Sequence, residues 1–460
     1  MKVVHVPFGY YPDPVGGTEV YVAELVESLR RRGIDSVIAA PSLGVESRTY
    51  EYGGALVHRF VVGATKNVSD LYGEGDPASA AAIERILADT GADVLHLHAF
   101  TTAASLKAVQ VARRRGVAVA FTYHTPTASC VRGTLLRDGR EACDGELIEQ
   151  RCASCLLESR GAGEAVRELL SRLPPTVGSA VAATGASGPW VTALRARELT
   201  RSRHAGFRQL LQNVDAVIAV CEWVRSLLLR AGATPSRLML SRQGTAARPR
   251  VHTPSVDPTV PLRLAFVGRL HPTKGVDIVV KALASRPELR ATLDVYGVAQ
   301  DASAMRYAAE LRALAANDSR IRFLNAVPRA AVVPTLAAYD ATVVPSQWLE
   351  TGPLTVLESF AAGLPVVGSH LGGIAELVSH DRDGWLVSHS DPSAWATAIE
   401  RLAADRSLLA RLTAGVERPR STDDVARDMA SVYESIVPRR NNGDRAHASP
   451  ESGAVAAGAV

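Results

Sequence analysis

The stretch PSQWLETGPLTVLESFAAGLPVVGSHLGGIAELV, residues Pro345–Val378, carries the clearest structural signal in the chain. An apolar strand ends just before it, and a loop containing Glu350 leads to Gly352-Pro353. Proline is favoured at the first position of a helix, so a helix is expected from there to Gly363. The next residues predict a second strand. This order of strand, loop, helix and strand is typical of an α/β domain.

The start of that helix is a candidate ligand site. The backbone N–H groups of Leu354 and Thr355 have no partner within the helix, and the helix dipole favours an anion there. Glu350 precedes the helix and Glu358 lies inside it. Two interpretations of these carboxylates stay open on the residues alone: they hold a ligand, or one caps the helix and the other is solvated.

A second candidate site lies in Phe266–Asp277, FVGRLHPTKGVD. A strand ends, Gly268 allows the backbone to turn, and Arg269 and Lys274 flank a short loop before a helix. A planar guanidinium and a point-charge ammonium together suit a diphosphate. The alternative is a pair of solvated loop cations.

Short apolar strands alternate with amphipathic helices through most of the chain, which predicts two doubly wound parallel sheets. Strands are expected at 3–7, 36–40, 93–98, 117–123, 216–220, 262–267, 292–296, 321–323, 341–344 and 365–367. Helices are expected at 18–32, 78–90, 101–115, 222–230, 276–283, 302–315, 353–362 and 423–437. Ligands in such folds bind at the carboxyl ends of the strands, so the functional residues are expected in the turns that follow them.

The composition and the breaks in this pattern define the domains. The predicted boundaries are residues 1–245 for an N-terminal domain with a Cys-rich insertion at 126–160 and a helical insertion at 161–212, a Pro-rich linker at 246–261, a C-terminal domain at 262–420, a closing helix at 421–437 and a disordered tail at 438–460.

The net charge of +4 is too small to indicate a nucleic-acid partner. The chain opens on a strand rather than a secretory signal, which predicts a cytoplasmic protein. The uncharged segment 173–194 contains several Pro and Gly residues, which favours short surface helices or a loop over a membrane span.

The motifs quoted above resemble those of a known protein family. WLETGPLTVLESFAAGLPVV, GRLHPTKG and the later DGWLV resemble the retaining glycosyltransferases of family 4, also called group 1. GGTEVYVAEL, DVLHLH and FTYHTP in the first half fit the same family more loosely. The resemblance implies the GT-B fold, in which two Rossmann-like domains face a cleft and the last helix crosses back to the first domain.

The resemblance also implies roles for individual residues. Glu358 matches the residue that binds the ribose hydroxyls, and Glu350 the residue beside the donor sugar. Arg269 and Lys274 match the pair that holds the diphosphate, and His124 the active-site histidine. The implied catalytic residues are therefore His124, Glu350, Arg269 and Lys274, and the implied donor-binding residues are Gly16, Gly17, Gly268, Gly352, Leu354, Thr355 and Glu358.

The implied reaction moves a sugar from a nucleoside-diphosphate sugar to a hydroxyl of a sugar or lipid-linked acceptor, in polysaccharide, glycolipid or other glycoconjugate biosynthesis. Fixed cations stabilise the leaving diphosphate, so no divalent metal is expected to be needed. Retention implies attack on the same face of the sugar. The alternatives are a non-catalytic nucleotide-sugar-binding protein, and a phosphorylase or hydrolase on the same fold. A dinucleotide-dependent dehydrogenase is disfavoured because no G-x-G-x-x-G opens a helix.

One loop departs from the family pattern. Residues 241–245 read SRQGT where many members have Asn-Gly-Val-Asp, and only Gly244 matches well. Any ligand contact from this loop is therefore in doubt.

Four cysteines, spaced C-x12-C-x8-C-x2-C, follow His124: Cys130, Cys143, Cys152 and Cys155. Such spacing suits a structural zinc site, because four thiolates form a closed tetrahedral shell. Reduced unmetallated thiols and disulfides are the alternatives, and disulfides are disfavoured in a cytoplasmic protein.

A basic run has two interpretations, a solvated helix face or a peripheral contact with anionic lipid. Its members are Arg195, Arg197, Arg201, Arg203, His204 and Arg208. Among the other histidines, His5 and His96 are expected within strands. His98, at the carboxyl end of its strand, is either a strand residue or part of the cleft.

Overall fold

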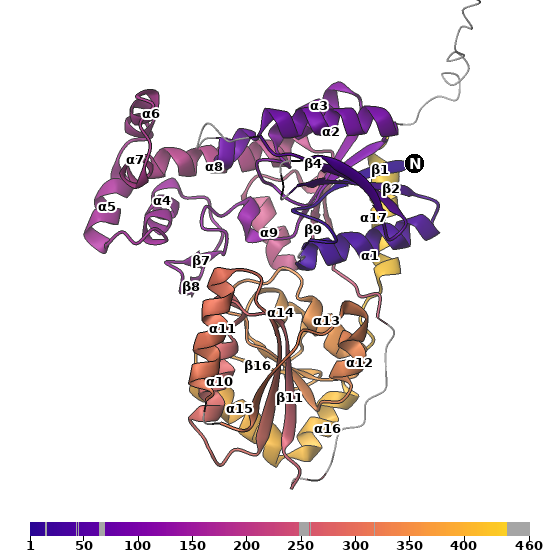
Figure 1. Ribbon diagram of the computed structural model, residues 1–460, viewed down its shortest axis with the longest axis vertical. Coiled ribbons are helices and arrows are strands. Elements are labelled where there is room, and N and C mark those ends of the chain that lie inside the picture. The colour runs from indigo at the N-terminus through magenta and orange to yellow at the C-terminus, as the bar shows by residue number, and fades with distance from the viewer. Residues whose placement is uncertain are drawn as a thin grey trace, which may run out of the picture.

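The computed structural model describes residues 1–438 except 14–15, 43, 45, 64–69, 248–256, 258 and 317. Two α/β domains lie one above the other in Figure 1. The predicted tail at 438–460 lies outside the described residues apart from Pro438, as does most of the predicted linker at 246–261.

The N-terminal domain contains an eight-stranded sheet in the order β10-β9-β6-β5-β1-β2-β4-β3. Its strands are β1 (Lys2–Val6), β2 (Asp35–Pro41), β3 (Arg48–Tyr52), β4 (Ala55–Phe60), β5 (Val94–Leu97), β6 (Ala118–Tyr123), β9 (Ala216–Ala219) and β10 (Leu238–Leu240). All pairs are parallel except β3 with β4. The expected parallel sheet is therefore confirmed, with an antiparallel edge strand that was not predicted.

Helices cover both faces of this sheet. One face packs against α2 (Pro77–Thr90), α3 (Leu106–Arg114), α8 (Ala196–Asn213) and α9 (Glu222–Arg230). The other packs against α1 (Gly17–Arg31) and α17 (Thr422–Ile436). Side chains alternate along β1, so that Val4 and Val6 enter the first core and Val3 the second, as the strand period of two requires.

The C-terminal domain contains a six-stranded parallel sheet in the order β13-β12-β11-β14-β15-β16. Its strands are β11 (Leu262–Arg269), β12 (Ala291–Val298), β13 (Ile321–Leu324), β14 (Ala341–Val344), β15 (Val366–Ser369) and β16 (Gly384–Val387). One face packs against α10 (Val276–Ala284), α11 (Ala302–Leu314), α15 (Pro392–Ala404) and α16 (Arg406–Ala414). The other packs against α12 (Val332–Leu336), α13 (Leu354–Ala361) and α14 (Gly372–Leu377).

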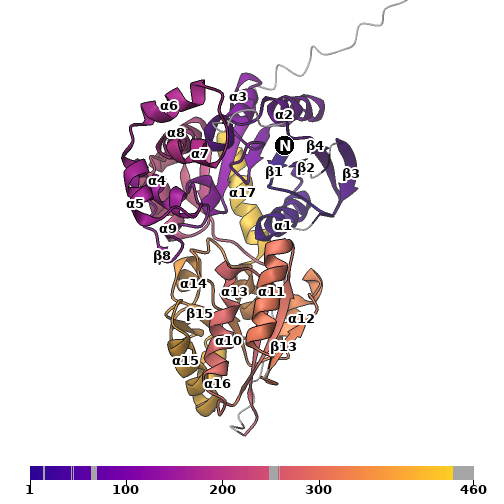
Figure 2. The same cartoon turned by 60° about the vertical axis from the view of Figure 1, so that its left-hand side comes forward.

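The closing helix α17 crosses back to the N-terminal domain, as predicted. Its apolar side, including Met429 and Tyr433, is fully buried in the core formed with α1. A capping box of Ser421 and Asp424 fixes where it begins. Figures 1 and 2 both show this yellow helix among the N-terminal elements, so α17 completes the core of the N-terminal domain.

The insertion after β6 projects to one side of the N-terminal domain (Figure 1). It contains the hairpin β7 (Leu136–Arg137) and β8 (Glu141–Ala142), then α4 (Glu149–Glu158), α5 (Glu164–Arg172), α6 (Pro175–Ala183) and α7 (Pro189–Leu194). The uncharged segment thus forms two short helices. None of the described helices combines the length and the apolar character that crossing a bilayer requires.

One local expectation was wrong, and several elements were not predicted: β3, β4, β10, β16, α12, α14, α15 and α16. The helix expected from Thr101 begins at Leu106, because Ser105 is extended, with φ −130° and ψ 179°. The hairpin β3–β4 was missed, although Gly53 and Gly54 turn between its strands with φ of 60° and 74°. Consecutive glycines between strands are a known hairpin signal, so this element was readable from the sequence.

Candidate functional site

A pocket of about 300 Å³ lies between the two domains. All eleven of the predicted catalytic and donor-binding residues line it: Gly16, Gly17, His124, Gly268, Arg269, Lys274, Glu350, Gly352, Leu354, Thr355 and Glu358. They come from the starts of α1, α10 and α13 and from the loops after β6, β11 and β14. These are the carboxyl ends of parallel strands, where the doubly wound fold places ligands.

Glu350 is buried beside a cation. Lys274 Nζ lies 2.5 Å from its Oε1 and Ser346 Oγ donates to the same oxygen at 2.8 Å. Burial alone would raise the pKa of Glu350, but the Lys274 ammonium and the Ser346 hydrogen bond outweigh it and hold the pKa below its usual value. Glu350 is therefore an ionised, well-held carboxylate that can accept hydrogen bonds from hydroxyl groups.

Arg269 differs from Lys274 in having no counter-ion in the part of the chain that the structure describes. It is exposed at the end of β11, and its guanidinium makes no ion pair with any described residue. Opposite it, α13 begins after Pro353 with no side-chain cap. Leu354 and Thr355, whose N–H groups open this helix, line the same pocket. A cation without an ion pair among the described residues and an uncapped helix start thus line one pocket, an arrangement that favours a bound anion.

Glu358 is buried in α13 and forms an ion pair with Arg329. Arg329 also donates to Glu24 of α1 at 2.8 Å. Because α1 belongs to the N-terminal domain, Arg329 connects the two domains at the edge of the pocket. Sequence reasoning missed Arg329, which precedes α12 in a short turn with no recognisable motif.

His124 follows β6 and is 5% exposed. Its Nε2 lies 3.1 Å from His98 Nδ1, and its Nδ1 lies 3.5 Å from the amide nitrogen of Gln243. Its backbone oxygen accepts from Thr351 Oγ1 at 2.5 Å. Burial lowers the pKa of His124 to about 3, so the imidazole is neutral near pH 7. A neutral imidazole offers one donor and one acceptor and does not act as a cationic acid.

The loop that departs from the family pattern contributes to the pocket after all. Gln243 lines it, and a Cβ added to Gly352 would lie 2.5 Å from the Gln243 carboxamide. Close packing requires a glycine at position 244, because a Cβ there would lie 2.4 Å from the backbone oxygen of Ser421. Sequence reasoning missed Gln243 as a pocket residue, and whether this loop contacts a ligand stays an open expectation.

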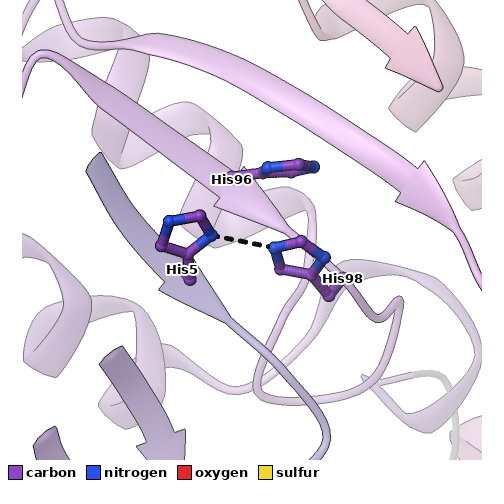
Figure 3. Close-up of side chains that lie close together, drawn as sticks. All are labelled: His5, His96 and His98. Carbon is purple, nitrogen blue, oxygen red and sulfur yellow. Dashed lines mark hydrogen bonds between the residues drawn. The ribbon is translucent and has the colours of Figure 1, made fainter. Parts of the chain in front are cut away.

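The four insertion cysteines are neighbours in space. Burial raises the pKa of the Cys152 thiol to about 12, and the nearby Cys130 and Cys143 raise it further. All of the chain's cysteines are free thiols. Among the described residues, however, the group of potential ligand atoms within 4.8 Å of one another is His5, His96 and His98 (Figure 3), and it includes no cysteine. The zinc site stays a prediction.

The basic run does not form an open cationic face. Arg195 pairs with Glu198, and Arg197 and Arg201 both lie near Glu149. Arg203 and His204 are buried, while Arg208 is exposed. Most of these charges are used inside the insertion, and lipid contact through them stays a prediction. His98 is 1% exposed and lies behind His124 rather than in the pocket lining.

Comparisons with known proteins agree with the fold. A family model described as "Glycosyl transferase 4-like domain" matches residues 16–244, and one described as "Glycosyl transferases group 1" matches residues 261–405. Sucrose-phosphate synthase from Thermosynechococcus elongatus superposes with a TM-score of 0.64 at 19% identity, covering 94% of this chain and 98% of that one. The Anabaena protein HepE, solved with UDP and glucose, gives a TM-score of 0.62 at 16% identity over 95% of this chain and all of its own.

Curated relatives match over part of their length. A D-inositol 3-phosphate glycosyltransferase of Thermobispora bispora is 32% identical over 265 residues, which are 52% of this chain and 60% of the relative. One from Catenulispora acidiphila is 33% identical over 225 residues, 44% of this chain and 51% of the relative. The chain thus spans about half to three fifths of these relatives. With both domains matched by family models and the GT-B architecture in place, the chain belongs to the group 1, family 4 glycosyltransferases.

Proposed function

We propose that this protein is a retaining glycosyltransferase that moves a sugar from a nucleoside-diphosphate sugar to an acceptor hydroxyl. The observation that carries the proposal is the convergence of all eleven predicted residues on one pocket between the domains. These residues come from widely separated segments of the chain. One capping and one solvated carboxylate, and two solvated cations, are the alternatives left open by the sequence, and such residues would have no reason to converge.

The charges of the pocket suit a diphosphate leaving group. Arg269 has no counter-ion among the described residues and faces the same pocket as the uncapped start of α13. Fixed donors of this kind stabilise negative charge that develops in a transition state, without reorganisation and without a divalent metal. The diphosphate would lie between Arg269 and α13, and Lys274 would reach it from beside Glu350.

The two carboxylates would hold the sugar ends of the donor. Glu358, at the far side of α13, would accept hydrogen bonds from the ribose hydroxyls. Glu350 would accept from hydroxyls of the transferred sugar. Because Lys274 and Ser346 already hold one of its oxygens, Glu350 fits a positioning role better than attack on the sugar. Retention would then follow from same-face attack by the acceptor, with a donor phosphate oxygen taking its proton.

The acceptor would enter from the N-terminal domain. Gly16 and Gly17 open α1 at the pocket, where neither residue has a side chain to occupy the space. A sugar or lipid-linked hydroxyl would reach the donor between these glycines and His124. UDP and UDP-glucose are the first probes, because the HepE structures were solved with them.

Calorimetry and thermal shift with UDP, GDP, ADP and TDP test the nucleotide site. A ligand that binds only the folded protein raises Tm by mass action. We expect one of the four to do so, and chelation of divalent metals should leave its affinity unchanged. No shift with any of the four would contradict the proposal.

Product analysis then separates the rival activities. A transferase yields a glycosylated acceptor with the donor's anomeric configuration, identified by NMR. Release of free sugar would indicate a hydrolase, release of sugar phosphate a phosphorylase, and tight binding without turnover a non-catalytic protein.

A further inference from the structure

A cluster of buried histidines lies one layer behind the pocket. His5 comes from β1, His96 from β5 and His98 from the residue after β5, and they are 0%, 0% and 1% exposed. Figure 3 shows His5 and His98 facing each other across neighbouring strands. They lie on the sheet face that α1 and α17 cover. The proposed reaction gives no role to any of these three imidazoles.

Two of these rings, His5 and His98, form a hydrogen-bonded chain with His124 that leads to the pocket. His5 Nδ1 lies 3.0 Å from His98 Nε2, and His98 Nδ1 lies 3.1 Å from His124 Nε2. His124 lines the pocket, whereas His5 and His98 do not. The chain therefore connects the buried end of β1 to a side chain that a ligand can touch.

The cluster is poorly suited to a metal ion, although its nitrogens are close together. Both nitrogens of His96 are already bonded, to Tyr433 Oη and Thr122 Oγ1 at 2.7 Å each. The His96 and His98 rings lie against each other with centroids 3.9 Å apart and ring planes tilted by 35°. A metal binds an imidazole nitrogen through its lone pair in the ring plane, and rings that pack face against face do not direct those lone pairs at one point.

The hydrogen-bonded series of His5, His98 and His124 fixes the position of one proton on each of the three rings. Burial lowers the pKa of His5 and of His124 to about 3, so both are neutral and each has one donor and one acceptor nitrogen. His5 Nε2 is buried and has no hydrogen-bond partner among the described residues. A buried N–H without an acceptor is rarer in proteins than an unfilled acceptor. The His5 proton therefore belongs on Nδ1.

The other protons follow in turn. His5 Nδ1–H donates to His98 Nε2, so the His98 proton is on Nδ1 and is donated to His124 Nε2. The His124 proton is then on Nδ1, on the side of Gln243. Gln243 Oε1 has no partner in the described part of the chain, and a half-turn of the carboxamide would bring this oxygen opposite His124 Nδ1.

We propose that His5 and His98 are positioning residues, which hold His124 as its Nδ1–H tautomer and so present an N–H donor to an oxygen at the pocket. That oxygen would be Gln243 Oε1 in the free protein and an oxygen of the donor's sugar when it is bound. The tautomer depends only on the chain of histidines, whereas the contact with the sugar rests on the proposed function.

The tautomer is tested by NMR of the full-length protein labelled with 15N-histidine. In the wild type we expect His124 to be protonated on Nδ1 only. His98→Asn places an amide N–H near the former Nδ1 and should preserve this pattern. His98→Gln places its amide near the former Nε2 and should shift His124 towards the Nε2–H tautomer. His58→Gln, on β4 away from the chain, is the matched control and should change nothing.

Calorimetry connects the tautomer to ligand binding. His98→Gln should weaken UDP-glucose binding about fivefold, the effect expected for one neutral hydrogen bond, with UDP affinity unchanged. His5→Leu, which removes only the first link, is the second variant if His98→Gln does not fold. Nε2 protonation of His124 in the wild type, an unchanged tautomer in His98→Gln, or a shifted tautomer with unchanged UDP-glucose affinity would each overturn the proposal. If wild-type protein binds neither ligand, the proposed function fails while the NMR result stands.

Discussion

Arg269 and Lys274 are both cations of the pocket, but they contact different groups. Lys274 neutralises buried Glu350, whereas Arg269 has no ion-pair partner in the described part of the chain. We predict that Arg269→Ala weakens UDP binding roughly 10- to 100-fold, because one charge-assisted contact is worth about 1.5–3 kcal/mol, and leaves Tm unchanged. Calorimetry and thermal unfolding measure the two effects.

Lys274→Ala should have an additional effect on stability. Removing one partner of a buried ion pair leaves an uncompensated charge and costs about 3–5 kcal/mol, so Tm should fall together with UDP affinity. Lys281→Ala removes an exposed lysine paired within its own helix and serves as the control. Equal Tm values for the Arg269 and Lys274 variants would show that the Lys274–Glu350 pair has no role in stability.

Substitutions of the two carboxylates, Glu350 and Glu358, should differ in which ligand they affect. If Glu358 binds the ribose, Glu358→Ala weakens UDP and UDP-glucose alike, because both contain it. If Glu350 binds the transferred sugar, Glu350→Ala weakens UDP-glucose more than UDP. Calorimetry of both variants with both ligands gives the comparison. The same loss for each variant with each ligand would mean that the assignment is wrong.

Single residues show where sequence reasoning succeeds and where it stops. Glu350 and Glu358 were found because they stand in one contiguous motif with a helix start between them. Gln243 was missed because its loop departs from the family pattern. Arg329 was missed because its importance depends on two partners, Glu24 and Glu358, that only the fold brings together. A sequence motif indicates the structure of its own segment. It does not indicate contacts between residues that are far apart in the sequence.

At the scale of elements, most central strands of both sheets were predicted, because burial on two faces leaves apolar runs. The hairpin strands β3 and β4, the strands β10 and β16, and the helices α12, α14, α15 and α16 were not. The β3–β4 hairpin is largely exposed on β3, so its hydrophobic alternation is weak. The start of α3 depends on Ser105 packing against Gly75, where an added Cβ would lie 2.0 Å from the serine Cβ. The hairpin was nevertheless marked by its turn residues Gly53 and Gly54, whereas the start of α3 is set by a tertiary contact rather than by propensity.

The insertion of β7, β8 and α4 gives an element-scale prediction about metal. Zinc would deprotonate thiols whose pKa burial raises, as it does for Cys152, and would draw four neighbouring sulfurs together. We expect about one zinc per chain by elemental analysis of protein purified without chelator. The double variant Cys152→Ser with Cys155→Ser should lose the zinc and make the insertion more susceptible to proteolysis.

Cys221 provides the control for the zinc experiment. It is buried at the start of α9, outside the insertion, so Cys221→Ala should keep the metal. UDP binding should also survive in the double variant, because the nucleotide would lie against the C-terminal domain. A metal content near zero in reduced, chelator-free wild-type protein would leave four ordinary thiols.

At the scale of the whole molecule, a side chain of the C-terminal domain caps a helix of the N-terminal domain and so connects the two. Helix α9 has no side-chain cap of its own. The carboxylate of Glu376, on α14 of the other domain, instead accepts the N–H groups of Glu222 at 2.8 Å and Trp223 at 2.7 Å. The indole N–H of Trp223 donates to the backbone oxygen of Glu350 at 3.0 Å. The same contacts thus close the cleft and position the loop that contains a predicted site residue.

This arrangement predicts that Glu376 controls domain closure. Loss of a helix cap costs about 0.5–2 kcal/mol, so Glu376→Ala should shift the molecule towards an open form with a larger radius of gyration by small-angle X-ray scattering. The pocket takes residues from both domains, so UDP-glucose affinity should fall as well, although Glu376 does not line the pocket. Saturating UDP-glucose should restore the compact form, because a ligand held by both domains favours closure by its differential affinity. Glu417→Ala, which removes a carboxylate that is 77% exposed, should leave both measurements unchanged. Unaltered scattering and affinity in Glu376→Ala would mean that other contacts, such as Arg329 with Glu24, are enough to hold the domains together.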